Sequence, residues 1–145
     1  YLTIQKMRYR DILDYEIEVE PNVLDGTILK LILQPLVENA IYHGIKNKRS
    51  GGTVIVRAYQ KDKEKVFLEV EDNGIGFDPM FRDRIFRPFE RLHGKNAYSG
   101  TGMGLAICQR VAERHGGTIT AESVPGEGSK FFVVLPINPV DPEDF

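Results

Sequence analysis

The sequence predicts an α+β fold in which helices cover one face of a mixed β-sheet. Five short segments have the alternating or β-branched pattern of strands, and two longer segments place their apolar residues on one helical face. Strand and helix segments are interleaved along the chain, and most strand segments follow one another closely enough to form hairpins. These observations favour a sandwich of one sheet and one layer of helices.

The predicted strands are residues 15–20, 53–59, 66–71, 118–123 and 129–136. The first alternates apolar and acidic residues, as a half-buried strand does. The second and third are expected to form one hairpin. The last two are expected to form another, around a turn at residues 125–128 that contains Pro125, Gly126 and Gly128.

The predicted helices are residues 27–45 and 105–115, where apolar residues recur with helical spacing. Pro35 lies inside the first pattern and predicts a kink or an interruption. Gly116 and Gly117 follow the second pattern and predict a left-handed cap at its end. Residues 72–101 show little periodicity apart from a short helix around residues 80–86, which is typical of a functional or mobile segment.

The composition describes an ordinary globular domain of 145 residues with a formal net charge of −2. This charge disfavours a general nucleic-acid binder, which needs concentrated positive charge. The single cysteine, Cys108, excludes an internal disulfide and fits a reducing compartment, so we expect a cytoplasmic protein. No run approaches 18 apolar residues, and the chain begins with Tyr1, so we expect a fragment whose membrane anchor, if any, lies elsewhere.

Asp72 ends the third predicted strand and is followed by Asn73, Gly74, Ile75 and Gly76. A carboxylate in this place is suited to accept a hydrogen bond from an exocyclic amine such as adenine N6. The two glycines would let the backbone come close to a planar ring. Taken alone, the segment favours the simpler interpretation of a turn after a strand.

A second glycine-rich segment directly precedes the second predicted helix. It consists of Gly100, Thr101, Gly102, Met103, Gly104 and Leu105. Backbone N–H groups freed by glycines, together with the positive end of a helix dipole, bind anions such as a triphosphate. The spacing fits neither a dinucleotide-binding fingerprint nor a Walker A loop. A flexible linker before a helix is the alternative.

A polar group lies on the first predicted helix, where Asn39 and His43 are four residues apart and share a face. An asparagine oxygen is a reasonable Mg²⁺ ligand, because Mg²⁺ keeps several waters and binds phosphates at the same time. Glu38 is the nearest carboxylate. The alternative interpretations are a solvated polar face and, for His43, an ordinary hydrogen-bonded side chain.

Five motifs in a fixed order resemble the sensor histidine kinases of the GHKL ATPase superfamily, over about residues 28–136. They are QPLVENAIYHG around Asn39, DNGIGF from Asp72, RIFRPFER around Phe86, GTGMGLAI from Gly100 and GEGSKF from Gly126. Residues 1–77 resemble the autolysin-type branch of these kinases, and the part from residue 81 onward resembles the mainstream branch. A natural hybrid and a chimera both fit this division.

The resemblance implies a Bergerat-type two-layer α/β sandwich, with about five strands packed on three helices and a mobile ATP lid. It implies that residues 1–137 form a histidine kinase ATP-binding catalytic domain, with 1–12 as the end of a preceding helix and 138–145 as a flexible tail. The cofactors implied are ATP and Mg²⁺. Departures from the family pattern are Pro35, where many members have asparagine, and Tyr42, where many have a basic residue.

The resemblance also assigns roles to individual residues. Asn39 is expected to coordinate Mg²⁺, with Glu38 and His43 beside it in the catalytic group, and Asp72 is expected to bind adenine N6. The nucleotide-binding residues implied are Asn39, Asp72, Gly74, Gly76, Phe86, Phe89, Gly100, Thr101, Gly102, Met103, Gly104 and Leu105. Phe86 and Phe89 would anchor the lid, whose cations are Arg82, Arg84, Arg87, Arg91 and Lys95.

The activity implied is transfer of the ATP γ-phosphoryl group to a histidine on a separate dimerisation domain, with a response regulator as the downstream partner. His43, His93 and His115 lack the setting of an acceptor histidine, so the acceptor is expected outside this chain. Neither nucleic acid nor a membrane is expected as a direct partner. The alternatives are an anti-sigma-factor-type serine kinase, a hydrolytic ATPase of the same fold and an interaction module that has lost ATP binding.

Overall fold

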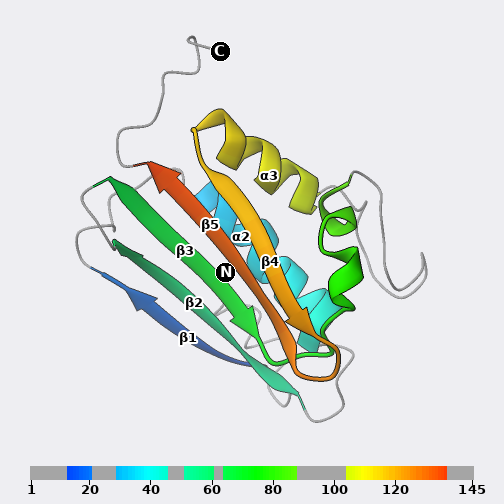
Figure 1. Ribbon diagram of the computed structural model, residues 1–145. Coiled ribbons are helices and arrows are strands. Elements are labelled where there is room, and N and C mark those ends of the chain that lie inside the picture. The colour runs from blue at the N-terminus through cyan, green and yellow to red at the C-terminus, as the bar shows by residue number, and fades with distance from the viewer. Residues whose placement is uncertain (1–12, 21–28, 46–50, 61–63, 88–103, 137–145) are drawn as a thin grey trace.

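The computed structural model describes residues 13–20, 29–45, 51–60, 64–87 and 104–136, which form a sheet with helices on one of its faces (Figure 1). The strands are β1 (Leu13–Val19), β2 (Gly52–Gln60), β3 (Lys65–Asp72), β4 (Thr118–Val124) and β5 (Gly128–Pro136). The α-helices are α2 (Leu29–Asn39), which continues into a π-helical segment (Ala40–Ile45), and α3 (Gly104–Arg114). The predicted fold class is confirmed, and the described residues contain two of the three expected α-helices.

The strand order in the sheet is β1-β2-β3-β5-β4. Strands β1 and β2 pair in parallel and the other neighbours are antiparallel, so the sheet is mixed, as predicted. Strand β3 is central, and Val70 lies between Val56 of β2 and Phe131 of β5. Its last residue, Asp72, lies between Val54 and Ser129. The sequence motif that begins at Asp72 therefore starts at the end of the central strand, with a neighbouring strand on each side.

The hydrophobic core lies between the sheet and the helices. Buried residues alternate along the strands, because successive side chains point to opposite faces. The core includes Ile32, Leu36, Ala40 and Ile41 from the first helix, Cys108 and Ala112 from α3, and Val54, Val56, Leu68, Val70, Ala121, Phe131 and Val133 from the strands. The Phe131 ring meets Phe86 edge-on at 6.2 Å between centroids and Phe77 at 6.5 Å. Phe131 thus connects the sheet to two segments outside it.

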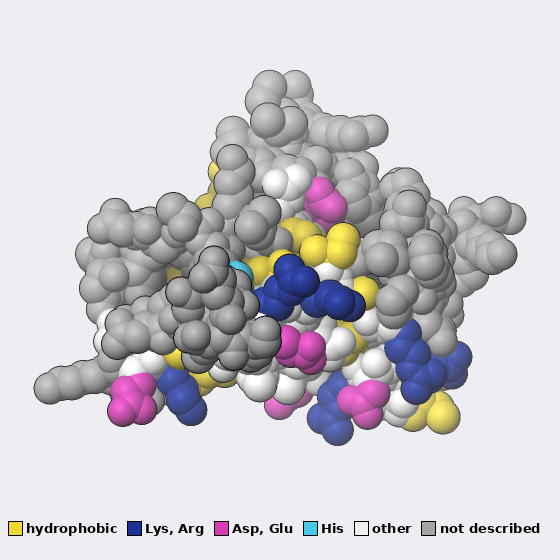
Figure 2. All heavy atoms as spheres, turned by 90° about the horizontal axis from the view of Figure 1, so that it is seen from above, with side chains coloured by type: hydrophobic (Ala, Val, Ile, Leu, Met, Phe, Trp, Pro, Cys, Tyr) yellow, Lys and Arg dark blue, Asp and Glu magenta, His cyan; other side chains and the backbone are white. Residues whose placement is uncertain are grey.

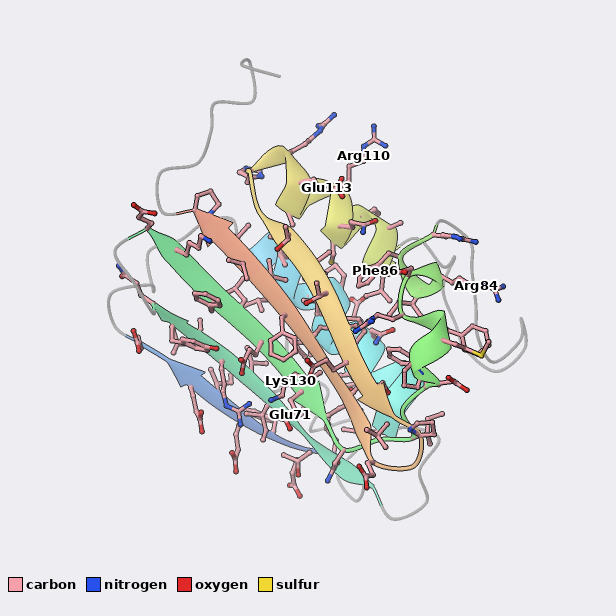
Figure 3. All side chains as sticks on the ribbon, in the orientation of Figure 1. Glu71, Arg84, Phe86, Arg110, Glu113 and Lys130 are labelled. Atoms are coloured by element: carbon pink, nitrogen blue, oxygen red, sulfur yellow. The ribbon has the colours of Figure 1, made fainter. Side chains whose placement is uncertain are left out.

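The opposite face of the sheet carries charged and aromatic side chains. Arg57 lies 3.1 Å from Glu18, 3.5 Å from Glu69 and 2.7 Å from Glu71, between nitrogen and oxygen atoms. The hydrogen bond to Glu71 raises the pKa of the Arg57 guanidinium above its ordinary value. Lys130 lies beside Glu71 on this face (Figure 3). Such partly solvated pairs are worth little individually, but as cross-strand neighbours they favour the observed register.

Local elements agree with the sequence except at two points. Pro35 lies inside α2, which is not interrupted there, and the change from α-helical to π-helical geometry comes only at Ala40. The short helix predicted around residues 80–86 is instead two single 3-10 turns, Pro79–Phe81 and Arg84–Phe86. Their hydrogen bonds run from residue i+3 back to residue i, as from Arg82 N to Pro79 O and from Arg87 N to Arg84 O, which is the 3-10 and not the α-helical pattern.

The end of α3 has the predicted left-handed cap. Gly116 has φ 78°, its N–H donates to Glu113 O at 3.0 Å, and the N–H of Gly117 donates to Ala112 O at 2.8 Å. This pair of bonds is a Schellman motif.

Residues 1–12 and 138–145, predicted as a helix end and a tail, lie outside the described residues. No helix in the described ranges combines the length and apolar character that a membrane crossing requires.

The position of Phe131 predicts a large difference between two neighbouring phenylalanines. Phe131→Ala should lower the free energy of unfolding by about 3–5 kcal/mol, because it leaves a cavity under Phe77 and Phe86. Phe132→Ala, the matched control on the half-exposed face, should cost less than about 2 kcal/mol. Urea unfolding followed by circular dichroism measures both values. Equal losses would contradict the assignment of the two faces.

Candidate functional site

Asp72 is a buried carboxylate at the end of the central strand. Its side chain is on the same face of β3 as Leu68 and Val70, and the residue is 5% exposed. The N–H of Gly74 donates to Asp72 Oδ1 at 2.9 Å. A buried carboxylate is tolerated only when hydrogen bonds replace its hydration, so this bond is part of what holds Asp72 in place. The result is a hydrogen-bond acceptor, the Asp72 carboxylate, held in a fixed position at the border between the sheet and the helix layer.

The loop that follows Asp72 is tied to its neighbours on both sides. The side chain of Asn73 accepts the N–H of Thr53 at 2.7 Å, which connects the loop to β2. Ile75 O accepts the N–H of Gly126 at 2.7 Å, which connects it to the turn between β4 and β5. The N–H of Phe77 donates to Ser123 Oγ at 2.7 Å. The loop is therefore held at its beginning, middle and end.

Two glycines allow the loop and the β4–β5 hairpin to approach each other closely. Gly76 has φ 67°, and a Cβ there would collide with Val124 O and lie 3.0 Å from Ser123 Oγ. Gly128 has φ 127°, and a Cβ there would collide with Asp72 O and lie 2.8 Å from Asn73 Cα. The second contact shows why the GEGSKF motif is joined to the DNGIGF motif in space.

Helix α2 and its π-helical continuation pack on the sheet, including β3, and carry the polar group predicted from the sequence. Glu38 and Asn39 are half-buried and end the α-helical part, and the π-helical segment begins at the next residue. Gln34 Nε2 donates to Glu38 Oε1 at 3.2 Å. The π-helical segment ends at Ile45, whose Cγ1 is 3.1 Å from where a Cβ on Gly52 would lie. Single π-helical turns are rare and often occur at functional sites.

Helix α3 begins close to the same part of α2. A Cβ on Gly104, the first residue of α3, would lie 3.7 Å from Pro35 Cβ. Because Pro35 and Asn39 are one helical turn apart, the start of α3 lies near the end of α2. The thiol of Cys108 donates to Ile32 O at 3.4 Å, and burial raises its pKa to about 12, with the Glu38 carboxylate adding to the shift. The structure thus brings Asn39, Glu38 and Gly104 to one region.

The remaining residues predicted for the nucleotide site or the lid do not join this region, apart from Leu105 at the start of α3, or lie outside the described residues. Phe86 is 6% exposed and packs against Phe131, so it is part of the core. Leu105 is half-buried at the start of α3. Arg84 points away from the sheet (Figure 3), and its guanidinium lies 5.3 Å from the centre of the Phe81 ring. Phe89, Gly100, Thr101, Gly102, Met103, Arg91 and Lys95 lie outside the described residues, and so does the side chain of His43.

A cavity of about 300 Å³ opens elsewhere, between the 3-10 turns, α3 and β4. It is lined by Arg82, Asp83, Phe86, Gln109, Ile119 and Thr120. Ile119 and Thr120 are at the opposite end of β4 from Ser123, so this cavity is separate from the Asp72 loop. On the face seen from above, basic and acidic side chains are interspersed in the described residues (Figure 2).

Sequence reasoning missed Asn73 and Ser123. The sequence marks Asn73 only as part of a turn, because no pattern within a loop shows that a side chain reaches another strand. Ser123 did carry a signal, because it falls on the alternating face of β4 with Ile119 and Ala121. A serine at an apolar position of a strand implies a buried hydrogen bond.

The contact between Gly128 and Asp72 predicts different effects at two glycines of one turn. Gly128→Ala should lower the free energy of unfolding by about 2–5 kcal/mol, because a positive φ and a backbone collision act together. Gly126→Ala is the matched control. Gly126 has φ 82°, but nothing lies within 4 Å of a Cβ there, so we expect a loss of about 1–2 kcal/mol. Thermal and urea unfolding compare the two, and equal losses would show that the collision is relieved at no cost.

Comparisons with known proteins agree with this architecture. Residues 24–139 match the protein family described as histidine kinase-, DNA gyrase B-, and HSP90-like ATPase. The phytochrome-like protein Cph1 of Synechocystis sp. is 45% identical over 105 residues, which are 72% of this chain and 14% of Cph1. The chain therefore spans a small part of this curated relative.

Solved structures of kinases have the same fold. The mycobacterial sensor histidine kinase MprB is similar with a TM-score of 0.75 and 30% identity, over 96% of this chain and 92% of that one. Full-length ShkA, solved in complex with AMPPNP, is similar with a TM-score of 0.77 and 26% identity, over 97% of this chain and 29% of that one. The chain belongs to the histidine kinase-, DNA gyrase B-, and HSP90-like ATPase family, and within it to the ATP-binding domains of sensor histidine kinases.

Proposed function

We propose that this domain, at residues 1–137, binds Mg-ATP and donates the γ-phosphoryl group to a histidine on a separate dimerisation domain. The observation that carries the proposal is the buried Asp72 carboxylate, held by the Gly74 amide at the end of the central strand. A fixed carboxylate acceptor selects a ring that presents an N–H donor. Adenine presents its N6 amine, whereas guanine presents an oxygen at the equivalent position.

The phosphates would lie toward the start of α3. Gly104 is next to Pro35, one turn from Asn39, so an anion at this helix N-terminus would also be close to the end of α2. The chemistry of Asn39 fits Mg²⁺, because an amide oxygen is a hard ligand of the kind that Mg²⁺ binds together with water and phosphate oxygens. Mg²⁺ would then be held by the Asn39 oxygen together with phosphate and water oxygens, and it would neutralise charge on the phosphates. Glu38 and His43 are proposed to lie beside it.

Catalysis by such a domain consists mainly of positioning the phosphoryl group and stabilising its charge. Backbone amides of the second glycine-rich segment and a cation of the lid would contact the phosphates. The nucleophile would come from outside. His115 is committed to its own helix, because its Nδ1 lies 2.8 Å from Val111 O. The parent protein would act in the cytoplasm and pass the phosphoryl group to a response regulator.

The adenine assignment predicts a large effect at one carboxylate. Asp72→Ala deletes a charge-assisted hydrogen bond worth roughly 1.5–3 kcal/mol, so affinity for Mg-ATP should fall about 10- to 150-fold. Glu122→Gln, which changes an exposed carboxylate on β4, is the control and should bind as the unchanged chain does. Isothermal calorimetry measures both. An Asp72→Ala variant with unchanged affinity would refute the assignment.

The transfer reaction is tested by adding the histidine-bearing domain of the parent protein. Alone, the chain should bind radiolabelled ATP and release little phosphate. With the dimerisation domain present, label should appear on that domain as an acid-labile phosphohistidine. Steady phosphate release without a partner would instead indicate a hydrolytic ATPase, and an acid-stable phosphoprotein would indicate a serine kinase.

A further inference from the structure

The Ser123 hydroxyl is a buried polar group at the junction of three backbone segments. Ser123 is 9% exposed and lies on the face of β4 that packs toward the helices. Its Oγ lies 2.7 Å from the N of Phe77, 2.8 Å from the O of Gly128 and 2.9 Å from the Oγ of Ser129. The first partner belongs to the loop after β3 and the other two belong to β5.

The direction of each of these hydrogen bonds follows from what each group can do. A serine hydroxyl has one proton to donate and can accept two. The carbonyl of Gly128 only accepts, so the Ser123 proton goes to it. The N–H of Phe77 only donates, and Ser123 accepts it. The Ser129 hydroxyl must therefore donate to Ser123, and the bonding capacity of Ser123 Oγ is then fully used.

The groups held by Ser123 are the ones that define the loop after Asp72. Phe77 ends this loop, and its ring packs on Phe131 at 6.5 Å. Gly128 lies so close to Asp72 O that a side chain there would collide with it. Gly76 passes Ser123 Oγ closely enough that a Cβ would lie 3.0 Å away. The hydroxyl thus sets the spacing between the loop and the β4–β5 hairpin.

We propose that Ser123 is a positioning residue of the nucleotide site, acting through Phe77 and Gly128 rather than by touching the ligand. This inference rests on the proposed function, because it assumes that the loop from Asp72 to Phe77 receives the purine. Without the hydroxyl, the Phe77 N–H and the Gly128 carbonyl lose a buried partner. The loop then occupies its binding-competent position for a smaller fraction of the time. The apparent affinity for nucleotide falls in proportion to that fraction.

The test compares Ser123→Ala with Thr120→Ala, which removes a hydroxyl from the exposed face of the same strand. Ser123→Ala should weaken binding of Mg-ADP about 5- to 20-fold by calorimetry, and Thr120→Ala should leave it unchanged. Phosphoryl transfer at saturating ATP should keep its rate, so that KM changes and kcat does not. Hydrogen exchange by NMR should show the Phe77 amide exchanging faster in Ser123→Ala, with amides of α3 unaffected.

A conservative variant separates positioning from general stability. Ser123→Thr keeps the hydroxyl on a strand-favouring residue and should restore both the protection of the Phe77 amide and the affinity. The inference is overturned if Ser123→Ala binds nucleotide as the unchanged chain does, or if all amides exchange faster by the same factor. It is also overturned if Ser123→Thr protects Phe77 but binds as weakly as Ser123→Ala. If the unchanged chain binds no nucleotide, the proposed function fails, and exchange at Phe77 alone reports whether Ser123 holds the loop.

Discussion

A carboxylate buried at the end of the central strand is the constraint on which the site depends. Strand β3 alternates, so Asp72 shares its face with Leu68 and Val70 and enters the layer covered by the helices. A charge placed there must be hydrogen-bonded, and the chain meets this requirement by turning sharply enough for the Gly74 N–H to reach Oδ1. The β4–β5 hairpin packs directly beside this turn. Gly76 and Gly128 permit this close approach, because a side chain at either position would collide with the backbone of the other segment.

The core and the site share the same side chains. Phe131 packs against Phe77, which ends the loop after Asp72, and against Phe86, which ends the second 3-10 turn. The sheet therefore supports both segments through one buried ring. In a small domain with one core, the geometry of the loop and the free energy of unfolding are expected to change together when this ring is altered.

The two faces of the sheet have separate tasks because strand side chains alternate. Residues facing the helices supply apolar packing and the buried hydroxyl of Ser123, whereas the opposite face carries the ion pairs of Arg57. Burial and a hydrogen bond to Glu69 raise the pKa of Tyr59 to about 12 on that face. These groups contribute to register and lie on the face opposite the proposed nucleotide site.

The sequence by itself determined the local elements. Alternation located all five strands to within two residues at each end, and glycine chemistry identified the cap at Gly116. The motifs also drew attention to Asp72, whose binding role stays a prediction. These features depend on neighbours in the chain, which periodicity and turn propensity record. Roles assigned by resemblance to Asn39, Glu38 and His43 remain predictions.

Only the tertiary structure decided which distant segments meet. The parallel pairing of β1 with β2, the start of α3 beside Pro35 and the contact of Gly128 with Asp72 join residues far apart in the chain. The change to π-helical geometry after Asn39 and the two 3-10 turns in place of a short helix were likewise seen only in the structure. Ser123 shows the reason most clearly: its alternation marks it as buried, but its three partners are chosen by the fold, because a hydrogen bond depends on position in space and not on distance along the chain.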